Sequence, residues 1–102
     1  MRKRGDSSRA RFLVKLSGEA LGGPSGVGVD GAAVTSIGRE VAQAHHQTEG
    51  LAVVIGGGNF FRGGRSVPWS LDRVTGDHVG MLATVMNGLL LYDWFKSSGV
   101  RA

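Results

Sequence analysis

Two glycine-containing segments of this sequence carry residue types suited to phosphate chemistry. The sequence KLSG at 15–18 ends one apolar run, and a second apolar run at 51–55 leads directly into GGGN at 56–59. Glycine allows backbone N–H groups to approach anionic oxygens closely, and ligands of open α/β sheets bind beyond the C-terminal ends of the strands. If both apolar runs are strands, the two segments are candidate phosphate-binding loops.

Two basic side chains beside these segments could act on phosphate groups. The ammonium group of Lys15 could neutralise a transferring phosphoryl group, and the guanidinium group of Arg62 could clamp a phosphate with two hydrogen bonds. Each has a plainer interpretation, namely an edge lysine that reaches water and a surface arginine beside a simple turn. The sequence has no G-x-x-x-x-G-K-[ST], and no G-x-G-x-x-G directly follows an apolar run. Any nucleotide site here therefore has a different design.

Asp77 is the acidic candidate for a contact with substrate. It and His78 fall in the first turn of the last predicted helix, where Asp77 could accept a hydrogen bond from a ribose hydroxyl or could simply compensate the helix dipole. His45 and His46 are neighbours on a helix and cannot face one site, so we expect them to be solvated. The chain has no cysteine, and we identify no metal ligands in it.

The elements that must position these residues alternate between strand and helix. We predict a strand at 11–16, a loop or irregular hairpin at 21–29, and a helix that is capped by Asp30 and stopped by Gly50. The continuous apolar run at 51–55 favours a parallel strand that is covered on both faces.

A long helix is predicted from Asp72 or Thr75 to a stop at Gly99. Its expected buried face consists of Val79, Leu82, Met86, Leu89 or Leu90, and Trp94. The last residues, 100–102, resemble the start of another strand. We therefore predict an α/β fold, the N-terminal part of a three-layer, doubly wound and mainly parallel sheet that is truncated at this point.

Charge and composition place few limits on function. The 102 residues carry a net charge of +4, with five basic residues and one acidic residue at 1–12 against seven of each in the remainder. We expect residues 1–10 to be a disordered leader and 11–102 to be the domain; an organellar transit peptide and a nucleic-acid-binding arm are the weaker alternatives. No apolar stretch reaches the ~20 residues of a membrane span, and we expect a cytoplasmic protein.

Three blocks of the sequence resemble a known family. VKLSGEAL at 14–21, VVIGGGNFFRG at 53–63 and DRVTGDHVGMLATVMNG at 72–88 are similar to successive signature blocks of bacterial UMP kinases, in the amino acid kinase superfamily. The first two blocks also have counterparts in aspartate, glutamate and acetylglutamate kinases. The third is the most specific of the three.

The resemblance implies phosphoryl transfer from ATP to UMP, with magnesium, to give UDP and ADP. Lys15 and Arg62 would be catalytic, while Gly57 and Asp77 would bind UMP. The residues implied for ATP are Lys15, Leu16, Ser17, Gly18, Gly58 and Arg62. The resemblance also implies a cytoplasmic homohexamer that GTP activates and UTP inhibits, with the GTP response linked to Gly23, Pro24, Ser25, Gly26, Val27 and Gly28.

The resemblance also limits what this chain could do alone. In the family, the region that binds the ATP base and further UMP contacts lie in the C-terminal half, so we expect the 102-residue chain to carry half a site and to be inactive by itself. Two alternatives remain open. One is a noncatalytic or truncated nucleotide-binding module, and the other is a related kinase that acts on a carboxylate or a carbamate.

Overall fold

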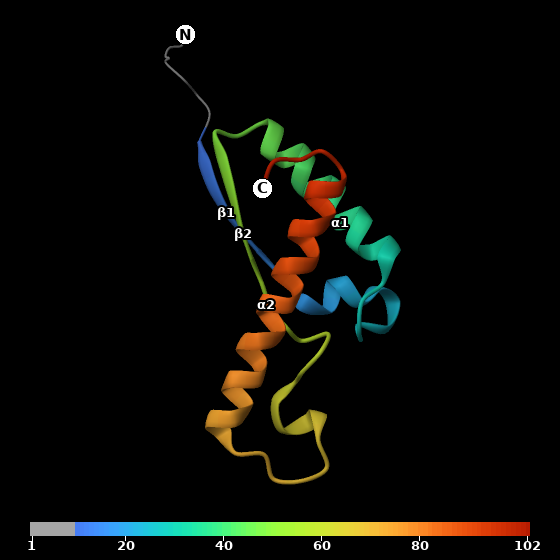
Figure 1. Cartoon of the computed structure of the whole chain (residues 1–102), viewed down its shortest axis with the longest axis vertical. Coiled ribbons are helices and arrows are strands. Elements are labelled where there is room, and N and C mark those ends of the chain that lie inside the picture. Colours follow the sequence, from blue (N-terminus) through green and yellow to red (C-terminus); the bar gives the residue numbers. More distant parts are fainter. Residues whose placement is uncertain (1–9) are drawn as a thin grey trace.

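The computed structural model describes residues 10–102, so the leader predicted at 1–10 lies outside the described residues except for Ala10. Its elements alternate along the chain (Figure 1). They are β1 (Arg11–Leu16), the 3-10 helix η1 (Gly18–Ser25), α1 (Gly31–His46), β2 (Gly50–Ile55), the 3-10 helix η2 (Gly63–Ser66) and α2 (Arg73–Ser97). The predicted strand–helix–strand–helix order is confirmed.

The two strands form a parallel pair in which Arg11 lies opposite Gly50 and Leu16 opposite Ile55. A parallel pair needs a crossover connection, and α1 supplies it. Both strands end at the same edge, where the two glycine segments begin. Beyond this edge, residues 56–72 and the N-terminal half of α2 extend past the strands (Figure 1).

Aspartate side chains fix the starts of both α-helices. Asp30 accepts a hydrogen bond from the Ala33 backbone N–H at 3.0 Å, and Asp72 accepts one from Thr75 at 3.1 Å. Both are N-caps that satisfy a backbone donor at the open end of a helix. The first helix ends before Gly50, as predicted, but Gly50 is not its stop: α1 ends at His46, and Gly50 is the first residue of β2.

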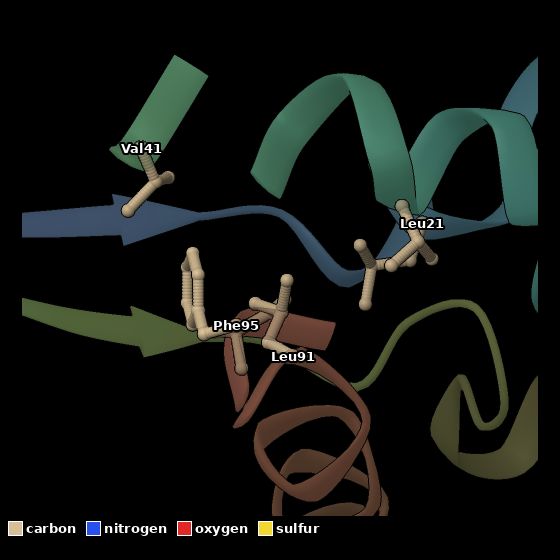
Figure 2. Close-up of a cluster of buried hydrophobic side chains, with 6 residues drawn as sticks. Leu21, Val41, Leu91 and Phe95 are labelled. Atoms are coloured by element: carbon tan, nitrogen blue, oxygen red, sulfur yellow. The ribbon is translucent and has the colours of Figure 1, made fainter. Parts of the chain in front are cut away.

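The core lies between one face of the sheet and the two α-helices. Figure 2 shows Val41 of α1 and Leu91 and Phe95 of α2 gathered beside the strands, with Leu21 of η1 in the same cluster. The residues that pack against this cluster are Leu16, Ile37, Leu51, Val53, Trp94 and Val100. Segment 21–29, predicted as a loop or hairpin, thus includes the end of a 3-10 helix that contributes a buried leucine.

The opposite face of the sheet is open. Leu13 and Val54 project from this face and are exposed, so within residues 10–102 the helices cover one face only. The predicted α/β unit with parallel strands is confirmed. Within residues 10–102 the second face of the sheet has no covering element, and residues 100–102, predicted as the start of another strand, are not in a strand. The described chain is a two-layer α/β unit with a parallel pair of strands.

The buried face of α2 also differs from the predicted one. Leu82, expected in the core, is 63 % exposed, whereas Leu91 is 3 % exposed. The buried positions follow a strict four-residue step through Ala83, Asn87, Leu91 and Phe95. The prediction selected large apolar side chains, and it missed a contact face that begins with a small residue and an amide. No described helix has both the length and the apolar character needed to cross a membrane.

Candidate functional site

The two glycine segments touch each other at the ends of the strands. A Cβ atom on Gly18 would lie 2.4 Å from the Gly56 carbonyl oxygen and 2.8 Å from the Gly58 nitrogen, which is closer than real Cβ atoms approach. Backbone therefore packs directly on backbone here, and only glycine fits at position 18. The contact brings together two segments separated by nearly forty residues of sequence, as expected for loops at one edge of a parallel sheet.

Gly57 joins the second loop to α2. A Cβ atom at this position would lie 2.6 Å from the Ala83 Cβ and 3.1 Å from the Thr84 nitrogen. The Gly57 carbonyl accepts hydrogen bonds from the backbone N–H groups of Phe60 and Phe61, both at 3.0 Å. The glycine run is therefore a tight turn that packs against α2. Its conformation is fixed by that contact and by the hydrogen bonds from Phe60 and Phe61.

A pair of buried asparagines locks this arrangement. Asn87 of α2 is 0 % exposed and Asn59 is 3 % exposed. Their side-chain amides exchange hydrogen bonds at 2.8 and 3.2 Å, Asn87 Nδ2 also donates to the Gly56 carbonyl at 2.8 Å, and Asn59 Nδ2 donates to the Gly28 carbonyl at 2.8 Å. Buried amides need such partners, and here the partners tie α2 and segment 21–29 to the glycine loop. Asn59 lies in a segment predicted as a candidate phosphate-binding loop, but the sequence predicted neither this pairing nor any role for Asn87.

Arg62 lies across the two loops. Its Nε donates to the Gly58 carbonyl at 3.3 Å, and its Nη2 forms an ion pair with Glu19 of η1. The Arg62 backbone N–H donates to the hydroxyl of Ser66 at 2.7 Å, which anchors the start of η2. The guanidinium group of Arg62 is thus held beside the glycine backbone, as the phosphate-clamp interpretation requires. Glu19 is another residue to which the sequence analysis gave no role.

An open pocket of about 900 Å³ lies between the loop after the glycine run and α2. Arg62 and Asp77 both line it, so the structure brings these two predicted site residues to one cavity. The other lining residues are Phe61, Gly63, Leu71, Asp72, Arg73, Gly76, Gly80, Met81 and Thr84. Because α2 begins at Arg73, Asp77 lies beyond the first turn, and its carboxylate is not a helix cap. The volume is within the range of small-molecule sites.

The remaining predicted ATP residues lie at the end of β1. Lys15 is exposed on the open face of the sheet, Ser17 is exposed at the start of η1, and Leu16 packs against the core. The Leu16 carbonyl accepts the Gly56 N–H at 3.0 Å, so this residue links the end of β1 to the second glycine loop. Lys15 does not line the pocket that holds Asp77.

Side chains that could hold a metal ion do not cluster in the described part of the chain. Within residues 10–102, no three histidine or acidic side chains gather closely enough to hold a metal ion. The carboxylate of Glu19 lies beside the second glycine loop, and it is paired with Arg62.

The parallel strand pair, with its two glycine loops meeting at one edge, is an α/β arrangement, and the comparisons assign it to a family. The model of the amino acid kinase family matches residues 10–102. The chain belongs to the amino acid kinase family. It is 49 % identical over 92 residues to a uridylate kinase of Streptomyces avermitilis and 49 % identical over 90 residues to one of Dichelobacter nodosus.

The chain is also similar to solved structures of UMP kinases. A UMP kinase from Ureaplasma parvum superposes on 94 % of this chain with a TM-score of 0.83 at 26 % identity, and one from Bacillus anthracis on 85 % with a TM-score of 0.75 at 38 % identity. The matched regions cover 90 % and 88 % of this chain but 36 % and 37 % of the two uridylate kinases, and 40 % and 36 % of the two solved chains. The sequence therefore spans little more than a third of the length of its relatives.

Proposed function

We propose that this chain is the phosphate-handling and UMP-binding part of a UMP kinase, which transfers the γ-phosphoryl group of ATP to UMP to give UDP and ADP. The observation that carries the proposal is the meeting of the two glycine segments, with Arg62 bridging them and lining the same pocket as Asp77. The similarity to uridylate kinases supports the choice of UMP as acceptor.

In this proposal the pocket beside α2 receives UMP. Asp77 would accept hydrogen bonds from the ribose hydroxyls, and the Gly57 backbone would lie against the acceptor phosphate. Arg62 would clamp phosphate oxygens between acceptor and donor, because its planar guanidinium group makes paired hydrogen bonds with them. Transfer would be in line and without a covalent enzyme intermediate, with positioning and charge neutralisation as the main contributions.

The ATP phosphates would lie on the side of the loops formed by the end of β1. Gly18, Ser17 and Gly58 would offer backbone and hydroxyl groups, and Lys15 would neutralise charge on the moving γ-phosphoryl group. The magnesium ion that accompanies ATP would be bound by phosphate oxygens, which neutralises their charge. The donor set within residues 10–102 includes no cluster of three acidic or histidine ligands for it, and we assign it no protein ligand here.

Assembly and regulation are further parts of the proposal. The resemblance to bacterial UMP kinases implies a cytoplasmic homohexamer with GTP as activator and UTP as inhibitor. Segment 23–28 would take part in the GTP response, and the hydrogen bond from Asn59 to the Gly28 carbonyl gives it a direct link to the glycine loop. Sedimentation velocity of the kinase that contains this segment joined to a complete C-terminal part, with and without GTP, tests the assembly. A single monomeric species under both conditions would contradict it.

The proposal is tested by joining this segment to the remaining part of the Streptomyces avermitilis uridylate kinase in place of its matched region. The hybrid kinase should form ADP with UMP and ATP, and a panel of CMP, aspartate and acetylglutamate should give little or none. Preference for aspartate or acetylglutamate would favour a kinase of carboxylates instead. Titration calorimetry of the 102-residue chain with UMP and with ATP shows what this part binds by itself.

A further inference from the structure

Glu19 places a negative charge inside the proposed phosphate site. Its carboxylate pairs with the Arg62 guanidinium group. It also lies close to the second glycine loop, because a Cβ atom on Gly58 would be 3.3 Å from Glu19 Cγ and 3.5 Å from Oε1. The two groups next to this carboxylate are the Gly58 backbone and the Arg62 side chain, and the proposed function assigns both of them to phosphate oxygens.

The ion pair can be displaced by an incoming ligand. The side chains of Arg62 and Glu19 are 40 % and 48 % exposed, so solvent and small anions reach both partners. A pair this exposed contributes little to stability. The second hydrogen bond of Arg62, from Nε to the Gly58 carbonyl, holds the guanidinium group in place when Glu19 leaves. The Arg62 guanidinium group thus stays in position beside Gly58 while the Glu19 carboxylate is paired with it.

We propose that Glu19 is an intramolecular competitor for the phosphate-binding guanidinium group. Resting on the proposed function, this makes Glu19 a determinant of phosphate affinity. A carboxylate attached to the chain has a high effective concentration at Arg62. A free ligand therefore displaces it only if that ligand carries more negative charge or makes more contacts. A phosphate carries a charge of roughly −1.5 to −2 near neutral pH and three acceptor oxygens, and so it can replace the carboxylate.

The substitution Glu19→Gln tests this, because glutamine keeps the size of the side chain and removes its charge. Calorimetric titration of the 102-residue chain with inorganic phosphate, and separately with UMP, should show about three- to fivefold tighter binding by the variant, which is the scale of an exposed ion pair. Glu49→Gln is the matched control. It removes the same charge from the pair of Glu49 with Arg11, at 3.8 Å and at the opposite end of the strands, and should bind phosphate like the parent chain.

A double variant locates the effect. In the background of Arg62→Gln, adding Glu19→Gln should give no gain in phosphate affinity over Arg62→Gln alone, since the competitor and its target are both absent. Unchanged or weaker phosphate binding by Glu19→Gln, including no detectable binding by either chain, overturns the proposal; a gain shared by Glu49→Gln does so too. The proposed function fails separately if UMP binds no more tightly than inorganic phosphate to the parent chain and both single variants.

Discussion

At the scale of single residues, the candidate site depends on side chains that are absent or neutral as much as on charged ones. Gly18 allows the two loops to touch, and the amides of Asn59 and Asn87 hold the second loop against α2. Arg62 and Glu19 then provide charge over this neutral framework. The charged groups can exchange partners because the backbone beneath them is fixed by groups that carry no charge.

Loss of the ammonium group of Lys15 should slow catalysis strongly. In the hybrid kinase we expect Lys15→Ala to lower kcat by at least ~10², the effect of removing one preorganised group that stabilises developing charge. Steady-state assays with saturating UMP and ATP measure this. Lys96→Ala, at the exposed C-terminal end of α2, is the control and should keep the parent rate. A kcat within a few-fold of the parent for Lys15→Ala would remove Lys15 from the mechanism.

The asparagine pair should contribute to stability as a unit. Asn87→Ala removes the donor to the Gly56 carbonyl and both hydrogen bonds to Asn59, whose Oδ1 loses its donor while Nδ2 keeps its bond to the Gly28 carbonyl, and it should lower the free energy of unfolding by about 2–3 kcal/mol. Urea denaturation measures the change. The exposed Gln43→Ala should stay within about 0.5 kcal/mol of the parent.

A double-mutant cycle shows whether the amides of Asn59 and Asn87 stabilise the fold as a coupled pair or through independent contacts. Combining Asn87→Ala with Asn59→Ala should cost less than the sum of the two single changes, since each single change already breaks the shared hydrogen bonds. Strictly additive costs would show that the two amides act separately.

At the scale of elements, α2 does two jobs with two parts of its length. Its C-terminal half packs into the core through Leu91 and Phe95, and its N-terminal half lines the pocket through Gly76, Asp77 and Gly80. Asn87 lies where the two parts meet. Much of the apolar surface of this helix is exposed, which explains why a pattern of large apolar residues did not identify the buried face.

Two leucines of α2 provide a direct check of its orientation. Leu91→Ala should lower the free energy of unfolding by about 2–5 kcal/mol, because it opens a cavity in the core. Leu82→Ala makes the same chemical change at an exposed position and should cost no more than about 0.5 kcal/mol. Urea denaturation of both variants gives the comparison, and a larger cost at position 82 would mean that the helix is rotated from the face described here.

At the scale of the whole molecule, the described chain is a small core with a two-stranded sheet, and such units are of marginal stability by themselves. A ligand that binds only the folded form stabilises it by mass action. The pocket is built from two segments, the loop after the glycine run and the start of α2, so its occupant would hold them together.

UMP should therefore raise the unfolding midpoint of the 102-residue chain. At a concentration about 100 times its Kd, the gain should be about 2.7 kcal/mol. Thermal unfolding followed by circular dichroism measures it. Uridine, which lacks the phosphate, should give a clearly smaller shift at the same concentration because it cannot contact Arg62. Equal shifts for UMP and uridine would mean that the phosphate is not bound at this site.

The sequence by itself determined the order of the strands and α-helices, and it predicted which residues along the chain would act on phosphate. Strand and helix order follow from local signals, namely the apolar runs, the two aspartate caps and Gly99 after the last helix. The three blocks with their counterparts in a known family pointed to phosphate transfer. Only the tertiary structure decided which face of α2 is buried, which face of the sheet is covered, and that Glu19 pairs with Arg62. These features depend on contacts between residues far apart in sequence. A glycine, an alanine or an asparagine shows its role only when the atoms it touches are known.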